Sequence, residues 1–99
     1  MMKFLTTTKT AVVYANCGLE SVYSYGKNVL EYDQNEHRIT LGKYWDYSVT
    51  TLSHIRKYFT NFFFDGQTVN TAKLRKAIKD GTIVINGTEY RVVYDREVA

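Results

Sequence analysis

The hydrophobic pattern of this chain changes its period near residue 51, and that change constrains the fold more than any other feature. Before it, β-branched and aromatic runs at residues 10–14 and 21–25 are separated by turn residues, which is typical of short strands. From residue 51 to residue 63, apolar side chains recur at helical spacing. Strands first and helices afterwards predict an α+β fold that begins with an antiparallel β-meander.

The two strands that follow can be aligned from their residues. Residues 28–33 and 37–41 flank a tight turn at residues 34–35, which places Glu31 opposite Arg38. The other face of this hairpin is then apolar and holds Leu30, Ile39 and Leu41. A sheet with one buried face requires this separation of charged and apolar side chains.

The first helix, over residues 51–63, has recognisable ends and two distinct faces. Ser48 or Thr50 can supply the N-cap oxygen, and Asp65-Gly66 ends the segment. Its apolar face consists of Leu52, Ile55, Phe59, Phe62 and Phe63. Its polar face consists of Ser53, Arg56, Lys57, Thr60 and Asn61. The helix is therefore amphipathic, with one face available for the core.

A second amphipathic helix is predicted over residues 71–80. Asn70 or Thr71 can cap its start, and Gly81 stops it. Its narrow apolar face holds Leu74, Ala77 and Ile78, and cationic side chains cover the opposite arc.

Residues 82–95 form the clearest hairpin of the chain. Asn86-Gly87 meets the requirement of a type I′ turn for positive φ at both central positions. The register that follows places Ile83 opposite Tyr90. No repeat, linker or low-complexity stretch interrupts the sequence, so residues 1–99 are predicted to form one α+β domain.

Composition limits the class of protein. Hydrophobic residues make up 44% of the chain, and no apolar run approaches the roughly 20 residues of a spanning helix, so a folded domain that does not cross a membrane is expected. The first eight residues lack the apolar core of a signal peptide, which predicts a cytoplasmic location. The single cysteine, Cys17, cannot form an internal disulfide, in agreement with a reducing compartment.

Positive charge is concentrated in the helical part. The net charge is +3, but residues 52–79 carry six cations against Asp65 alone. The candidate basic face consists of Arg56, Lys57, Lys73, Arg75, Lys76 and Lys79. Such a face could neutralise phosphates of a nucleic acid. A solvated charged face opposite an apolar stripe is the alternative, since most surface helices have one.

The sequence contains no recognisable motif for metal, cofactor or catalysis. Cys17, His37 and His54 are too few and too scattered to match a metal-ligand spacing. We expect His54 to lie on the polar, solvated side of the first helix. No sequence pattern identifies a nucleophilic serine or cysteine paired with a histidine base, and no glycine-rich phosphate loop is present. A protein without enzymatic activity and without a cofactor is therefore expected.

Tyr44, Trp45 and Tyr47 precede the first helix and form the candidate aromatic cluster. The chain has nine tyrosines, and residues with an apolar body and a polar tip are favoured where proteins bind partners. If the cluster is exposed, it is of the type that anchors interfaces. Core packing ahead of the helix is the alternative.

Several segments together resemble a unit found in small uncharacterised proteins of phages and mobile elements of Gram-positive bacteria. They are Ser24-Tyr25-Gly26, Asn28-Val29-Leu30, residues 37–41, and Tyr44-Trp45-Asp46-Tyr47-Ser48-Val49-Thr50-Thr51 with His54. The group has a Ser-Tyr strand start, a short hairpin and an aromatic-Tyr-Ser-x-Thr-Thr helix start. Gly26 departs from the polar residue expected after the Ser-Tyr pair.

By analogy, the resemblance implies a protein that binds host machinery, because small phage proteins often act stoichiometrically against host defences. The leading hypothesis is an anti-CRISPR-like inhibitor of a Cas nuclease such as Cas9, bound with its guide RNA. The basic charge with dispersed carboxylates disfavours simple DNA mimicry. The alternative is a small nucleic-acid-binding accessory protein that uses the basic face. A homodimer through edge strands stays open.

Overall fold

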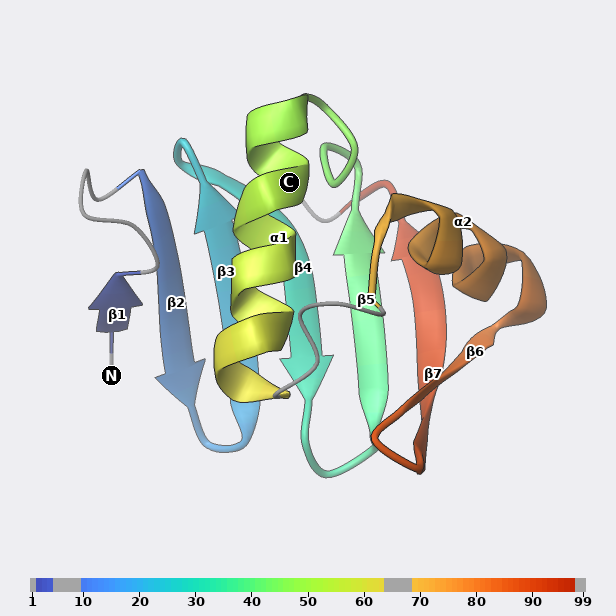
Figure 1. Cartoon of the computed structure of the whole chain (residues 1–99). Coiled ribbons are helices and arrows are strands. Elements are labelled where there is room, and N and C mark those ends of the chain that lie inside the picture. Colours follow the sequence, from blue (N-terminus) through green and yellow to red (C-terminus); the bar gives the residue numbers. More distant parts are fainter. Residues whose placement is uncertain (1, 5–9, 64–68, 98–99) are drawn as a thin grey trace.

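The computed structural model of the chain describes residues 2–4, 10–63 and 69–97 and shows an α+β fold, as predicted (Figure 1). Its elements, in chain order, are β1 (Met2–Phe4), β2 (Ala11–Asn16), β3 (Leu19–Ser24), β4 (Lys27–Asp33), β5 (Arg38–Gly42), α1 (Val49–Phe62), α2 (Thr71–Asp80), β6 (Thr82–Ile85) and β7 (Thr88–Asp95). The predicted order of a meander, two helices and a C-terminal hairpin is confirmed.

The strands form one sheet in the order β1-β2-β3-β4-β5-β7-β6. All neighbouring pairs are antiparallel except β5 and β7, which are parallel. A parallel pair needs a crossover connection, and here α1 and α2 lie in that connection. The sheet therefore consists of a meander and a hairpin that meet at one parallel joint.

Both helices cover the same face of the sheet. Figure 1 shows α1 across β3 and β4, and α2 beside β6 and β7. Burial alternates along the strands accordingly, as in β6, where Ile83 and Ile85 are buried while Thr82 and Val84 are exposed. The apolar core lies between the sheet and the helices, and its fully buried side chains include Val22, Leu30, Ile39, Leu41, Ile55, Tyr58, Phe59 and Val69. Neither described helix is long and apolar enough to cross a membrane.

The helix ends follow local chemistry. The side chain of Ser48, one of the two predicted caps, accepts a hydrogen bond from the Thr51 amide, so α1 begins two residues earlier than predicted. For α2 the predicted bounds and the caps at Asn70 and Gly81 are confirmed. The predicted stop of α1 at residues 65–66 lies outside the described residues.

The predicted face of α1 is correct in part. The five residues expected on the polar face are all exposed, and Ile55 and Phe59 are fully buried. Leu52, however, is half-buried, and the buried stripe is turned toward Thr51, His54 and Tyr58. The Tyr58 hydroxyl donates a hydrogen bond of 2.6 Å to Glu20 Oε1 on β3. Burial, followed by this hydrogen bond, raises the pKa of Tyr58.

The predicted register of β4 and β5 is wrong by two residues. Glu31 pairs with Thr40, and Arg38 pairs with Asp33 and forms a salt bridge of 3.5 Å with its carboxylate. The loop is longer than predicted because Asp33 Oδ1 accepts hydrogen bonds from the amides of residues 35 and 36, which starts the turn at Asp33. A shift of two residues leaves every side chain on its predicted face, so Leu30 and Leu41 still point into the core.

The C-terminal hairpin has its predicted register and turn. Ile83 pairs with Tyr90, and φ is 50° at Asn86 and 82° at Gly87. Two further described turns have positive φ at both central residues. One connects β2 and β3 through Cys17 (φ 51°) and Gly18 (φ 84°), and the other connects β3 and β4 through Tyr25 (φ 51°) and Gly26 (φ 78°). A bulky tyrosine at the first position of such a turn was not predicted. The glycine that departs from the phage-protein pattern is therefore suited to the second position of this turn.

Val22 is fully buried on β3. The substitution Val22→Ala should lower the free energy of unfolding by about 2 kcal/mol, because buried methyl groups are lost and a cavity is left. Urea denaturation followed by circular dichroism measures the change. Val84→Ala makes the same chemical change on β6 at a side chain that is 52% exposed, and it should cost less than about 0.5 kcal/mol. Equal losses in the two variants would contradict the one-sided core.

Candidate functional site

A buried polar network joins the end of β3 to the first turns of α1. Ser24 follows Val22 on the inward face of β3, and its Oγ lies 2.7 Å from His54 Nδ1. The Ser24 hydroxyl donates to Thr51 Oγ1 at 3.2 Å, and His54 Nε2 lies 3.4 Å from Thr10 Oγ1. The helix start and the strand end are thus held together by hydroxyl and imidazole groups.

The prediction that His54 is solvated is wrong, since its side chain is only 3% exposed. Thr51, His54, Ile55 and Tyr58 share the side of α1 that faces the sheet, and hydroxyl partners at both ring nitrogens make burial of the imidazole possible. Burial, followed by the nearby charge of Lys57, lowers the pKa of His54. The imidazole is therefore neutral at pH 7.

Sequence reasoning missed the Ser24 and His54 pair, because the two residues meet only through the packing of α1 on β3. Ser24 is almost fully buried, and its hydroxyl contacts both His54 Nδ1 at 2.7 Å and Thr51 Oγ1 at 3.2 Å. Among the described residues, the hydrogen-bond partners found for the two His54 ring nitrogens are hydroxyl groups, whereas a catalytic histidine of a triad is oriented by a carboxylate.

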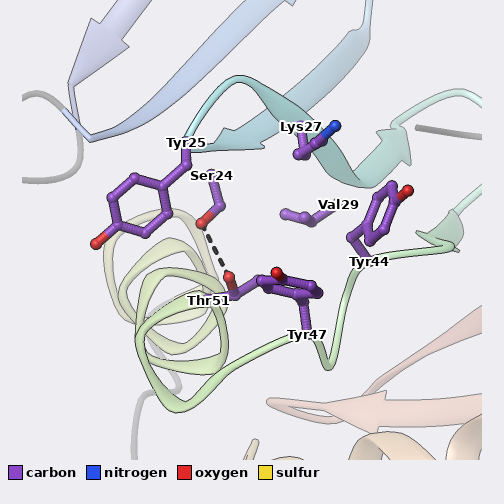
Figure 2. Close-up of a pocket in the computed structure, with 7 residues that line it drawn as sticks. All are labelled: Ser24, Tyr25, Lys27, Val29, Tyr44, Tyr47 and Thr51. Carbon is purple, nitrogen blue, oxygen red and sulfur yellow. Dashed lines mark hydrogen bonds between the residues drawn. The ribbon is translucent and has the colours of Figure 1, made fainter.

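A pocket of about 430 Å³ lies above this network, between the β3–β4 turn, the β5–α1 loop and the start of α1 (Figure 2). Its lining residues are Ser24, Tyr25, Lys27, Val29, Tyr44, Tyr47 and Thr51. We call it the tyrosine pocket. Figure 2 shows Tyr44 and Tyr47 on one side of the hydrogen bond between Ser24 and Thr51, with Tyr25 on the other side.

The three tyrosines of the pocket differ in exposure. Tyr47 is 75% exposed and Tyr25 is largely exposed, whereas Tyr44 is half-buried and contacts Tyr47 edge to face at 5.8 Å between ring centres. Val29, Ser24 and Thr51 also border the pocket, but each is at most 3% exposed. The pocket therefore offers mainly aromatic surface to solvent.

Tyr25 has a backbone conformation that bulky residues rarely adopt. Its φ of 51° lies in the left-handed region, which costs free energy for a residue with a Cβ. Its amide donates to the Thr10 carbonyl at 2.8 Å, and its ring lies 5.4 Å from the His54 ring. The turn and the buried histidine together fix an exposed aromatic ring beside the pocket.

One lysine lines the pocket, and a second lies beside one of its tyrosines. The Nζ atoms of Lys27 and Lys43 lie 5.1 Å and 5.4 Å from the centre of the Tyr44 ring, so both ammonium groups make cation–π contacts with it. No carboxylate is present among the seven described residues that line the pocket.

The predicted aromatic cluster is divided by the structure. Tyr44 and Tyr47 line the tyrosine pocket, but Trp45 is only 3% exposed and belongs to the core. The two alternatives left open by the sequence therefore apply to different members. Tyr25 and Lys27, from a segment distant in sequence, line the same pocket as Tyr44 and Tyr47. The sequence indicated this association only through the resemblance to phage proteins, which included both Ser24-Tyr25 and residues 44–51.

The predicted basic face is spread over two helices. Arg56 and Lys57 are exposed on α1, which crosses the middle of the sheet, and the remaining cations lie on α2 beside β6 and β7 (Figure 1). On α2, Lys73 is half-buried, and Arg75, Lys76 and Lys79 are exposed.

Arg75 takes part in an intramolecular contact. Its guanidinium forms a salt bridge of 3.2 Å with Asp46 and lies 5.3 Å from the ring of Trp45. This cation therefore fixes the β5–α1 loop against α2, and it is less available to a partner than Lys76 and Lys79.

The residues considered for metal binding stay apart. Cys17 is an exposed thiol in the turn between β2 and β3, His37 is exposed, and His54 is buried in the network. Within the described ranges, no three His, Cys, Asp or Glu side chains form a group that could hold a metal ion.

Comparison with family models gives a match: the model of a protein family matches residues 2–81. Neither the curated proteins nor the solved structures contain a match.

The lowered pKa of His54 predicts a specific pH dependence of stability. Below the ordinary pKa of 6.5 the unfolded chain binds a proton that folded His54 does not, so the free energy of unfolding falls as the pH decreases through that range. His54→Gln should reduce this fall, and thermal unfolding between pH 7.5 and pH 5 measures it. His37→Gln, which changes an exposed histidine, should retain the wild-type dependence. The same pH dependence in wild type and His54→Gln would contradict a buried neutral imidazole.

Arg75 should influence the fluorescence of the single tryptophan. Arg75→Gln removes the cation beside Trp45 and the salt bridge to Asp46, so the emission of Trp45 should change in intensity or wavelength. Because the Arg75 side chain is exposed, the free energy of unfolding should fall by less than about 1 kcal/mol. Lys76→Gln serves as the control on the same helix and should leave the emission unchanged. An unchanged spectrum for Arg75→Gln would show that the contact is absent in solution.

Proposed function

The chain belongs to a family of unknown function, DUF8033, and from this premise we propose that it acts without catalysis, by binding a partner through the tyrosine pocket. The proposed partner is a host defence complex in the bacterial cytoplasm, and the protein would act as its inhibitor. A Cas nuclease with its guide RNA, such as Cas9, is the first candidate.

The observation that carries the proposal is the set of tyrosines around one concave site. Tyr25 and Tyr47 are exposed and Tyr44 is half-buried, and they come from two segments that the network beneath them holds together. Tyrosine gives large contact area with little loss of conformational entropy, and such residues dominate the binding energy of interfaces.

The groups beneath and around the pocket favour binding over catalysis. Ser24 and His54, which lie in contact beneath the pocket, are only 2% and 3% exposed, so a substrate would have little access to them. The described residues that line the pocket include no carboxylate and no histidine, the side chains that most often act as a general acid or base.

The choice of partner rests on analogy. Ser24, Tyr25, Tyr47 and Thr51, from the segments that resemble small phage proteins, all line the tyrosine pocket. Such phage proteins often block host defences by stoichiometric binding. The net charge of +3 favours contact with a nuclease that carries RNA over imitation of DNA.

The test is size-exclusion co-elution of the protein with a Cas9–guide RNA complex, combined with a DNA-cleavage assay. The wild type should co-elute and inhibit cleavage. Tyr47→Ala should weaken inhibition about tenfold or more, because an exposed anchor residue is truncated. Tyr94→Ala changes a tyrosine that is 45% exposed on β7, outside the pocket, and should inhibit as the wild type does.

Two results would count against this function. The first is a wild type that neither co-elutes with the complex nor inhibits cleavage. The second is a Tyr47→Ala variant that inhibits as strongly as the wild type. If charge reversal of Lys73, Lys76 and Lys79 to glutamate abolished binding while Tyr47→Ala did not, the basic face would be the binding site instead.

A further inference from the structure

The aromatic surface of the tyrosine pocket is suited to a flat ring. Tyr47 is 75% exposed and meets Tyr44 edge to face, which leaves the remaining Tyr47 ring surface open to a stacking partner. Tyr25, also exposed, borders the pocket from the β3–β4 turn. Nucleobases stack on tyrosine in this way, and each stacked base contributes about 1–3 kcal/mol.

The charges around the pocket are suited to a phosphate. Lys27 lines the pocket, and Lys43 lies in the β5–α1 loop. The ammonium groups of both lie within 5.4 Å of the centre of the Tyr44 ring. Thr51 belongs to the first turn of α1, where the helix dipole is positive. No described lining residue carries a negative charge that would oppose an anion.

The size of the pocket and its exposed groups suit a nucleotide. Its volume of about 430 Å³ is within the usual range of small-ligand sites. Val29, Ser24 and Thr51 are almost fully buried at its base, so the exposed lining consists of the three tyrosines and Lys27. An aromatic surface with a cation beside it has the groups that recognise a base joined to a phosphate.

We propose that the tyrosine pocket binds one unpaired nucleotide, with its base stacked on Tyr47 and its phosphate at Lys27 and Lys43. This inference rests on the proposed function, since it names the group that the same pocket would contact in a partner that carries RNA. A duplex keeps its bases stacked inside the helix, so only a single-stranded segment or a free nucleotide presents the required surface.

Direct binding measurements test the proposal. Fluorescence anisotropy is recorded with labelled 12-residue oligo(U) and oligo(dT) and with a labelled duplex, and calorimetry is performed with UMP and AMP. At least one single strand should bind more tightly than the duplex, and its affinity should fall as salt increases. If UMP or AMP alone binds as tightly as the single strand, the source is a free nucleotide. If only the single strands bind, the source is an unpaired residue in a longer chain.

Matched variants locate the site. Tyr47→Ala should weaken binding about tenfold, the loss of one stacked base. Lys27→Gln should reduce the slope of log affinity against log salt by about one. Tyr94→Ala and Lys79→Gln change a tyrosine and a lysine outside the pocket, and both should bind as the wild type does. Circular dichroism checks that the Tyr47 variant is folded, as expected for truncation of a side chain that is 75% exposed.

The inference is overturned if neither oligonucleotides nor nucleotides bind, or if Tyr47→Ala and Lys27→Gln bind like the wild type. These failures are distinct from failure of the proposed function. If Tyr47→Ala loses co-elution with the Cas9–guide RNA complex and the wild type binds no oligonucleotide, the pocket contacts protein and only the nucleotide inference is wrong.

Discussion

The contact between α1 and β3 is apolar along most of the helix and polar at its N-terminal end. Ile55, Tyr58 and Phe59 enter the core, while Thr51 and His54 meet Ser24 through hydrogen bonds. Apolar packing alone tolerates sliding and rotation of a helix, but a buried imidazole has few places where both nitrogens find partners. The polar network therefore fixes where the helix starts relative to the strand, and the tyrosine pocket depends on that position.

Much of the fold could be predicted because its signals are local. The bounds of α2 follow from Asn70 and Gly81, and the C-terminal hairpin follows from Asn86-Gly87. The register of β4 and β5 could not be read in the same way. The hydrogen bonds that the Asp33 carboxylate accepts from the amides of its own loop lengthen the turn, and the pattern of apolar residues is unaffected by a shift of two.

The candidate site was predictable only in part, because it depends on contacts between distant segments. Tyr44, Trp45 and Tyr47 were expected to form one cluster, but Trp45 is buried in the core. A loop has no regular repeat of hydrophobic positions, so the sequence could not show which of the three side chains is buried. His54 was assigned to the polar side of the helix by its chemistry, whereas its burial depends on Ser24, which lies on another element. Lys27 and Tyr25 entered the site through a turn whose left-handed tyrosine no propensity would predict.

The single parallel pair in the sheet has a consequence for the order of folding. The meander of β2 to β5 closes through short turns. Arg38 of β5 and Arg91 of β7, in contrast, are separated in sequence by both helices and β6, so their pairing closes a long loop. Closing so long a loop costs chain entropy before any pairing compensates for it. We expect the hairpin of β6 and β7 to join last and to open first, so that its amides exchange with solvent deuterium sooner than those of β3 and β4.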